Sequence, residues 1–176
     1  MRDAERWIFG YGSLVWRPAF AYEERASGTI RGFSRRFWQG SPDHRGAPDA
    51  PGRVVTLVAD PAARCGGMAY RVSPAAWEAV LTALDVRESG GFERHEVTVE
   101  LAGEPPRSVP GLVYVAGAGN PNYLGPAPAE EIARQVRRCR GASGSNLEYV
   151  LRLVAALEAL GLPDPHVAEI ALLLEA

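Results

Sequence analysis

The sequence predicts an α+β fold in which strands come first and helices follow. The first two-thirds of the chain holds short segments rich in β-branched and aromatic residues, separated by Gly, Pro and Asp. The last third shows apolar residues at helical spacing. With 176 residues and 47% hydrophobic content, the chain can bury one sizeable core, so residues 1–176 are predicted to form a single domain.

Short strands are predicted, in chain order, over Trp7–Gly10, Gly28–Ile30, Ser34–Gln39, Arg53–Val58, Met68–Val72, Glu93–Leu101 and Gly111–Val115. The segment HEVTVEL alternates His95, Val97, Val99 and Leu101 with charged or polar residues, which indicates one buried and one solvent-facing surface. This pattern favours a mixed or antiparallel sheet. Residues 40–52 are too rich in Gly, Pro and Asp for a regular element, so they are predicted to form a long loop of functional importance.

One helix interrupts the predicted strands, and three helices follow them. Ser73 can cap the first helix, Pro74 suits its first position, and apolar residues recur at helical spacing from Trp77 onward. This helix is predicted to end near Asp85–Glu88, just before a pair of glycines. The later helices are predicted over Pro128–Arg138, Asn146–Leu160, which Gly161 closes, and Pro165–Leu174.

Composition and charge argue against several classes of function. The 19 basic and 21 acidic side chains leave a net charge of -2, with no surplus to hold nucleic acid or anionic lipid. The first residues lack the pattern of a signal peptide, and no apolar run approaches the ~20 residues that span a bilayer. Cys65 and Cys139 each stand alone, which predicts buried free thiols, a reducing cytoplasm and no zinc site.

The segment FGYGSLVW, residues 9–16, follows the first strand and is the sharpest local motif. Gly10 and Gly12 allow positive φ angles and a close approach of the backbone to a ligand. Successive peptide N–H groups there could bind a carboxylate, or stabilise the oxyanion that develops on an attacked carbonyl. An ordinary glycine turn is the alternative. The motif lacks the third glycine of a phosphate-binding fingerprint.

Glu88 lies where a helix is predicted to end and two glycines begin, between apolar Val86 and Phe92. A carboxylate at the partly dry mouth of a pocket has a raised pKa and can transfer protons near neutral pH. A solvated surface glutamate is the alternative, and spacing alone favours it. Arg87 is a candidate substrate anchor, with a surface role as its alternative.

Two further segments offer groups that bind carboxylates. RRFWQGSPDHRG, residues 35–46, supplies aromatic, amide and cationic side chains in Arg35, Arg36, Trp38, Gln39, His44 and Arg45. The alternative is a buried tryptophan and a solvated edge of arginines. In RCRGASGSNLEYV, residues 138–150, Ser143 or Ser145 opens a helix, either as a simple cap or beside amides that attract an anion.

Other catalytic arrangements fit the sequence less well. The three histidines are dispersed, without Cys or acidic residues at ligand spacing, which argues against a metal site. A Ser-His-Asp triad through Ser13 lacks the context of a nucleophile elbow.

Four segments, taken together and in order, resemble one family, the ChaC-like glutathione-specific γ-glutamylcyclotransferases. They are FGYGSLVW at 9–16, RRFWQGSPDHRGAPDAPGRVVTL at 35–57, LDVRESGGFERHEV at 84–97 and YLGPAPAEEIARQVRRCRGASGSNLEYV at 123–150. Each alone is a weak signal, whereas their joint order is specific and spans most of the chain. One departure is Ala47, where many members have threonine.

The resemblance implies a γ-glutamylcyclotransferase-like fold, a small mixed or antiparallel barrel-like sheet with flanking helices. It implies a substrate loop made of Gly10, Tyr11, Gly12, Ser13, Leu14 and Val15. It places the catalytic glutamate on Glu88. Substrate-binding roles are further expected for Arg35, Trp38, Gln39, Tyr123, Ser143 and Asn146.

The implied reaction is cyclisation of the γ-glutamyl group of glutathione to 5-oxoproline, with release of cysteinylglycine. Because the α-amine attacks the γ-carbonyl of its own molecule, orientation can remove on the order of 7 to 11 kcal/mol from the barrier, and no metal or cofactor is needed. Glu88 is expected to take the proton from the amine and return it to the leaving group. Two alternatives stay open: a cyclotransferase for other γ-glutamyl amino acids or amines, and a non-catalytic regulator of cation transport.

Overall fold

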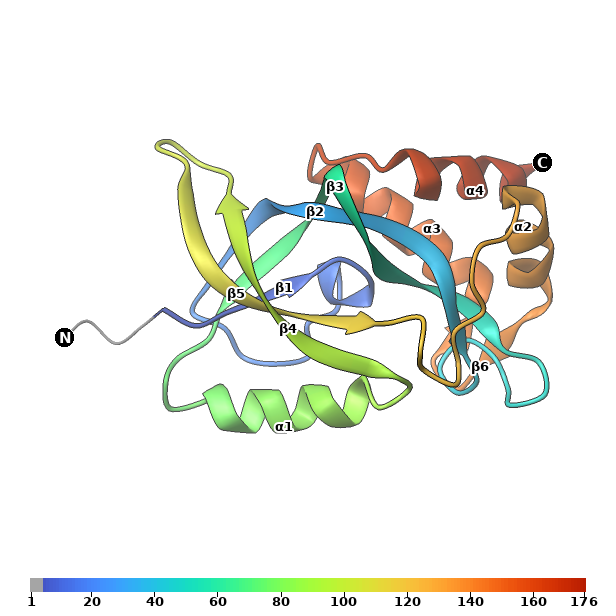
Figure 1. The fold of residues 1–176 in the computed structure, drawn as a ribbon, viewed down its shortest axis with the longest axis horizontal. Coiled ribbons are helices and arrows are strands. Elements are labelled where there is room, and N and C mark those ends of the chain that lie inside the picture. The colour runs from blue at the N-terminus through green and yellow to red at the C-terminus, as the bar shows by residue number, and fades with distance from the viewer. Residues whose placement is uncertain (1–4) are drawn as a thin grey trace.

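The computed structural model describes residues 5–176 and contains a closed five-stranded barrel (Figure 1). Its strands follow the order β1-β3-β2-β4-β5. β1 runs parallel to β5, and every other neighbouring pair is antiparallel. The small mixed barrel predicted from the sequence is therefore confirmed. The strands are β1 (Trp7–Gly10), β2 (Glu24–Ser41), β3 (Gly52–Arg71), β4 (Phe92–Leu101) and β5 (Arg107–Ala116).

Helices lie on two sides of the barrel, with α1 on one side and α2, α3 and α4 packed together on another (Figure 1). The elements outside the barrel are η1 (Ser13–Val15), α1 (Trp77–Arg87), α2 (Ala129–Arg138), β6 (Arg140–Gly141), β7 (Gly144–Ser145), α3 (Asn146–Ala159) and α4 (Pro165–Glu175). The predicted three C-terminal helices are confirmed to within a residue at each end. Within residues 5–176, no helix combines the length and the apolar character needed to cross a bilayer.

Helix α1 begins later than the sequence suggests. Ser73 was expected to cap it and Pro74 to open it, but the helix begins at Trp77. Residues 73–76 form a turn instead, in which the Ala76 N–H donates to the carbonyl oxygen of Ser73 at 3.1 Å and lies 3.2 Å from its Oγ. The serine therefore stabilises a turn that leads into the helix.

Strands β2 and β3 are each one long strand, where the sequence predicts two short ones. Arg31 pairs with Arg64 and Phe33 pairs with Ala59, so residues 60–63 stand opposite the single residue Gly32. Gly32 has a φ of 83°, which suits a bulge. The prediction of separate strands was wrong because a bulge that contains Pro and Gly has the same composition as a turn.

The burial pattern of β1 explains how the barrel meets its two groups of helices. Trp7 and Phe9 face the barrel core, which is continuous with the C-terminal helices, whereas Ile8 packs against the α1 side. Because β1 contributes side chains to the barrel core and to the cluster under α1, the turn that follows it is held between the two. In β4, Val99 and Leu101 are buried as predicted, but His95 is exposed.

Candidate active site

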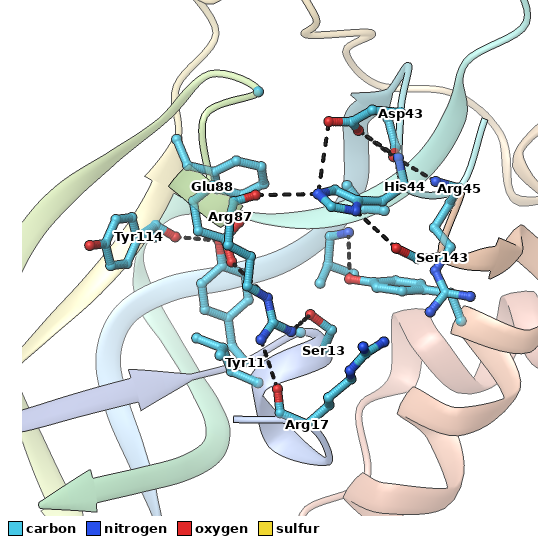
Figure 2. A pocket seen from close by; sticks show the side chains of 18 of the residues that line it. Tyr11, Ser13, Arg17, Asp43, His44, Arg45, Arg87, Glu88, Tyr114 and Ser143 are labelled. Carbon is cyan, nitrogen blue, oxygen red and sulfur yellow. Dashed lines mark hydrogen bonds and ion pairs between the residues drawn. The ribbon is translucent and has the colours of Figure 1, made fainter. Parts of the chain in front are cut away.

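A cavity of about 280 Å³ opens beside the turn that follows β1 (Figure 2). Small-molecule pockets typically measure about 300 to 1,000 Å³, so this one suits a compact ligand. Its walls come from the β1–η1 turn, the loop between β2 and β3, the end of α1, and the turn between β6 and β7. The loop of residues 40–52 predicted from composition thus contributes to a cavity, through residues 40–45.

Gly10 and Gly12 are required for space rather than for positive φ. Both are absent from the residues with positive φ, and Gly12 has φ -117° and ψ -129°, so that expectation was wrong. A Cβ on Gly10 would lie 2.5 Å from the Cβ of Leu14. A Cβ on Gly12 would lie 2.9 Å from the Tyr149 Oη and 3.1 Å from Val55. The turn therefore packs too closely for any side chain at these two positions.

The backbone of this turn carries free amides beside the cavity. Val15 is the first residue of η1 whose N–H is bonded, donating to the Gly12 carbonyl at 3.0 Å. Within residues 5–176, the N–H groups of Gly12, Ser13 and Leu14 donate to no acceptor, and all three residues line the cavity. Consecutive free amides of this kind can bind a carboxylate or a developing oxyanion.

Glu88 faces the same cavity from the end of α1 (Figure 2). Its N–H donates to the Leu84 carbonyl at 2.8 Å, which fixes the residue as the helix cap. Only 17% of its side chain is exposed, and within residues 5–176 its carboxylate accepts no hydrogen bond. Burial raises the pKa of Glu88, and the positive charge of Arg87 opposes that rise only in part.

Arg87 fastens the end of α1 to the glycine turn. Its Nη2 donates to the Ser13 Oγ at 2.8 Å, and its Nη1 donates to the carbonyls of Arg17 and Pro18 at 2.9 and 3.3 Å. Its Nε lies 3.9 Å from the Glu88 carboxylate, which is beyond hydrogen-bond distance. The guanidinium therefore holds the loop in place and leaves the carboxylate oxygens free.

The opposite wall joins the β2–β3 loop to the start of α3. His44 Nδ1 lies 2.9 Å from the Ser143 Oγ, and its Nε2 lies 3.3 Å from the Arg87 carbonyl oxygen. Arg45 donates to the Ser145 carbonyl at 3.0 Å and stacks on the ring of Tyr149. No group of three or more His, Cys, Asp or Glu side chains in the described part of the chain is arranged to hold a metal ion.

The model of the family described as ChaC-like protein matches residues 6–175, almost the whole chain. The chain belongs to the ChaC-like family. The resemblance noted in the sequence is thereby confirmed.

Relatives with assigned names share this ChaC-like sequence over most of their length. A human relative, "Glutathione-specific gamma-glutamylcyclotransferase 1", is 50% identical over 168 residues, covering 93% of this chain and 76% of its own. An Arabidopsis thaliana relative, "Gamma-glutamylcyclotransferase 2-3", is 43% identical and covers 94% and 86%. Both names describe cyclotransferases of γ-glutamyl compounds.

A solved structure supports the fold. The yeast γ-glutamyl cyclotransferase specific to glutathione superposes with a TM-score of 0.92 at 29% identity, covering 98% of this chain and 96% of its own. A more distant γ-glutamyl cyclotransferase, 16% identical, shares the fold with a TM-score of 0.56. The predicted γ-glutamylcyclotransferase-like fold is confirmed.

The cavity of this ChaC-like protein gathers about half of the residues expected to bind substrate or catalyse. Those that line it are Tyr11, Gly12, Ser13, Leu14, Glu88 and Ser143. Gly10 and Val15 belong to the same turn but do not line the cavity, since Gly10 pairs with Met68 in the barrel and Val15 is buried in the core.

Arg35, Trp38, Gln39, Tyr123 and Asn146 lie outside the cavity lining, so their expected contact with substrate stays a prediction. Buried Gln39 donates to the Gly90 carbonyl at 3.1 Å, and its backbone pairs with Tyr123. The Trp38 carbonyl accepts from the N–H of Leu124 at 2.9 Å. These groups brace the loops behind the cavity.

Two of those residues use their side chains to hold backbone segments together. The Asn146 Oδ1 accepts from the Arg53 N–H at 2.7 Å, and its Nδ2 donates to the Arg53 carbonyl at 2.8 Å. Arg35 donates to the carbonyl of Tyr11 at 2.8 Å from behind the turn. Both side chains are thus bonded to the backbone of neighbouring segments.

Tyr149, Tyr114 and Arg17 line the cavity of the ChaC-like chain but were missed as site residues. Tyr149 lies at the start of α3, shortly after Ser143 in the sequence, and this position was a usable signal. Arg17 comes directly after the glycine motif. Tyr114 lies near the end of the barrel strand β5, where the sequence gives no sign of a cavity.

Proposed function

We propose that the chain is a glutathione-specific γ-glutamylcyclotransferase, which converts glutathione to 5-oxoproline and cysteinylglycine. The observation on which this rests is the pairing of a buried, unbonded carboxylate on Glu88 with three free amides across one cavity. The names of the human and yeast relatives support glutathione as the substrate. The cyclisation needs a base for the amine and donors for the oxyanion, and these groups supply both.

In the proposed mechanism, Glu88 is the acid/base residue. The glutamyl α-ammonium gives a proton to the Glu88 carboxylate, and the resulting amine attacks the γ-carbonyl carbon. The tetrahedral oxyanion is stabilised by the amides of Gly12, Ser13 and Leu14. Glu88 returns that proton to the departing nitrogen as the former amide bond breaks. The ring nitrogen then passes its surplus proton through the freed Glu88 carboxylate to the released amine, which leaves 5-oxoproline and the ammonium form of cysteinylglycine.

Burial of Glu88 suits this role energetically. A carboxylate of ordinary pKa is a weak base toward an ammonium group. Because burial raises the pKa of Glu88, the difference in pKa between the substrate ammonium and this carboxyl group becomes smaller. Because Glu88 accepts no hydrogen bond within residues 5–176, it can accept one from the substrate ammonium without breaking another. Its neighbour Arg87 keeps the turn in place during the proton transfers.

Arg17 is the group we assign to the glycyl carboxylate of glutathione. Arg87 and Arg45 also line the cavity, but their guanidinium groups are bonded to protein acceptors. Arg17 is exposed, and within residues 5–176 its guanidinium donates to no acceptor (Figure 2). A free cation at the mouth can pair with the second carboxylate of a tripeptide, which γ-glutamylamines lack.

Incubation of the protein with glutathione, followed by detection of 5-oxoproline and cysteinylglycine, tests the proposed function. We expect equimolar release of both products, and a higher kcat/KM for glutathione than for γ-glutamyl-alanine. A clear preference for the dipeptide would show that other γ-glutamyl compounds, rather than glutathione, are the substrates. Binding of glutathione without any 5-oxoproline would contradict an enzymatic role and favour the regulator.

We also propose that the protein acts in the cytoplasm. The observation in support is that Cys65 and Cys139 are both free and buried, as is usual for proteins of a reducing compartment. A fusion to a fluorescent protein should distribute through the cytoplasm, and its recovery from an exported fraction would contradict this assignment.

A further inference from the structure

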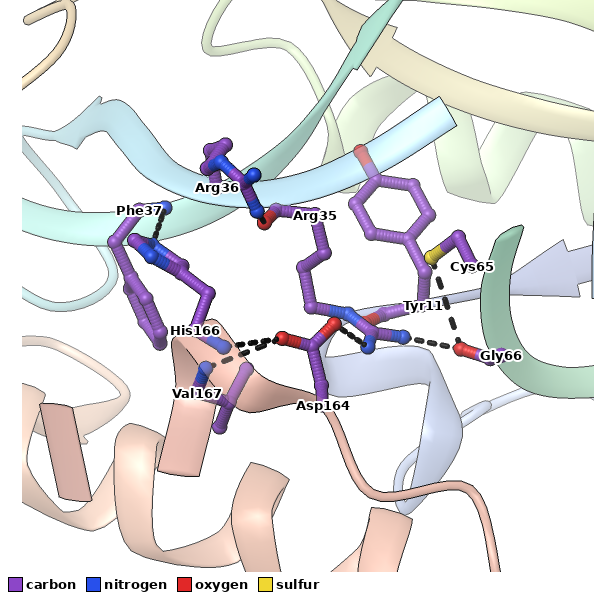
Figure 3. A network of polar contacts seen from close by, with 9 residues as sticks. All are labelled: Tyr11, Arg35, Arg36, Phe37, Cys65, Gly66, Asp164, His166 and Val167. Carbon is purple, nitrogen blue, oxygen red and sulfur yellow. Dashed lines mark hydrogen bonds and ion pairs between the residues drawn. The ribbon is translucent and has the colours of Figure 1, made fainter. Parts of the chain in front are cut away.

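Arg35 is buried behind the glycine turn, with 1% of its surface exposed and a partner at each of its nitrogens (Figure 3). Its Nε donates to the Tyr11 carbonyl at 2.8 Å, its Nη2 donates to the Gly66 carbonyl, and its Nη1 pairs with the Asp164 carboxylate at 2.7 Å. One guanidinium therefore joins the turn after β1, strand β3 and the residue that precedes α4.

Asp164 is itself held in place on its other side (Figure 3). Its Oδ1 accepts from the N–H groups of His166 and Val167 at 3.0 and 3.2 Å, which caps α4. Burial lowers the pKa of His166 to about 4, so its imidazole is neutral at neutral pH. Its Nε2 can therefore accept a hydrogen bond from the Phe37 N–H at 3.1 Å. Arg35 therefore has a fixed counter-ion rather than a mobile one.

The bond to Tyr11 also determines the direction of the next amide. The Tyr11 carbonyl and the Gly12 N–H belong to one trans peptide, so they point in opposite directions. Arg35 lies outside the cavity lining and Gly12 lies within it. A hydrogen bond that draws the carbonyl toward Arg35 therefore turns the Gly12 N–H away from Arg35.

We propose that Arg35 is a positioning residue of the cyclisation, which orients the Gly12 N–H toward the oxyanion without touching substrate. The inference rests on the proposed function, since it assigns Arg35 to the same oxyanion site. Lysine cannot replace Arg35, because a single ammonium cannot reach the three acceptors with the geometry of the guanidinium fork.

The test compares Arg35→Lys with Arg53→Lys as a matched control. Arg53 is also buried and donates to the carbonyls of Phe37 and Gly125, but its side chain does not touch the turn. Loss of an oxyanion donor lowers kcat about 10² to 10³-fold, so a misdirected donor should cost at least about tenfold. For Arg35→Lys we expect kcat to fall by at least about tenfold, with KM within about threefold of wild type. For Arg53→Lys we expect kcat within about twofold of wild type. Both are measured under conditions in which circular dichroism shows the variants to be folded.

A second readout does not depend on turnover. The amide resonance of Gly12 in a ¹⁵N-labelled protein should shift in Arg35→Lys and stay in place in Arg53→Lys. If wild type releases no 5-oxoproline, the proposed function fails, and this resonance still decides whether Arg35 orients the turn. An unmoved Gly12 resonance, or equal losses of kcat in both variants, would overturn the positioning role.

Should Arg35→Lys not fold, Asp164→Asn replaces it. Asparagine keeps an oxygen to cap α4 but removes the charge that fixes Arg35. We expect a smaller loss of kcat, about threefold or more, with a shift of the Gly12 resonance in the same direction. Unchanged kcat and an unmoved resonance in a folded Asp164→Asn protein would equally overturn the proposal.

Discussion

Two carboxylates at helix ends, Glu88 and Asp164, are buried to nearly the same degree but have different partners. Their side chains are 17% and 14% exposed. Asp164 precedes α4, where it accepts two backbone N–H bonds and pairs with Arg35 at 2.7 Å. Glu88 follows α1 and accepts no hydrogen bond within residues 5–176, and Arg87 lies 3.9 Å away.

Hydrogen-bond partners, more than exposure, therefore distinguish the two acids. The start of a helix stabilises a negative charge, whereas its end does not. The oxygens of Asp164 are occupied, so the residue contributes to stability. Those of Glu88 remain available for a proton from a ligand, and burial raises its pKa toward the range where it can exchange that proton.

The largest expected effect is the loss of turnover when the carboxylate of Glu88 is removed. Glu88→Gln removes the base but keeps the shape, so kcat should fall by about three orders of magnitude, within the 10² to 10⁴ range of acid/base catalysis. Glutathione binding, measured by calorimetry, should stay within a fewfold of wild type. Glu96→Gln, on an exposed residue of β4, is the control and should retain full activity. A Glu88→Gln kcat within tenfold of wild type would refute the role.

The next largest effect is expected for Asp164→Ala, which tests the structural role of the second carboxylate. This change leaves the buried Arg35 charge uncompensated and removes the cap of α4, so the free energy of unfolding should fall by about 3 kcal/mol or more. Urea denaturation measures this effect, with Asp49→Ala on an exposed loop residue as the control. A loss below about 1 kcal/mol would mean that the ion pair adds little to stability.

Arg17 extends the comparison from acids to cations, because it lines the cavity with its guanidinium unbonded within residues 5–176. Arg17→Gln should raise the KM for glutathione by about tenfold, the value of one charge-assisted hydrogen bond, with little change in kcat. Glutathione ethyl ester, which lacks the glycyl carboxylate, should be affected by the change much less. Equal losses with both substrates would point to a structural role instead.

The smallest effect concerns the stability of Glu88→Gln. Burial raises the folded-state pKa of Glu88 above its unfolded value, so folding favours the protonated form. Wild type therefore loses stability as pH rises through the folded-state pKa, and the glutamine variant does not. The variant should be slightly more stable at neutral pH, with the gain vanishing below the ordinary glutamate pKa of about 4.3. If the variant were less stable than wild type at neutral pH, the claim that burial of the Glu88 charge costs stability would be contradicted.

Much of the fold follows from the sequence, because helix spacing and capping are local. Ser145 and Asp164 cap α3 and α4 with their own side chains, close to where the sequence predicts helices to begin. The long strands β2 and β3 could not be foreseen in the same way. Whether Gly32 forms a bulge or ends a strand depends on its partners in β3, which are distant in sequence.

The candidate site divides along the same line. Glu88 and the glycine turn stand out because their segments resemble the family's motifs, whereas spacing alone favours a surface glutamate. Arg35 and Asn146 also stand out, but their partners, Tyr11 and Arg53, are known only once the chain is folded. A polar residue in a motif segment can thus support a site from behind, and sequence alone does not separate that role from contact with substrate.

The most direct test of the account is the titration of Glu88 itself beside the pH profile of the enzyme. The ¹³C carboxyl resonance of Glu88 should titrate above the ordinary glutamate pKa of about 4.3, because the side chain is buried and unbonded. The acidic limb of kcat/KM for glutathione should fall at that same pH. A Glu88 that titrates in the ordinary range, or an acidic limb at an unrelated pH, would contradict its assignment as the acid/base residue.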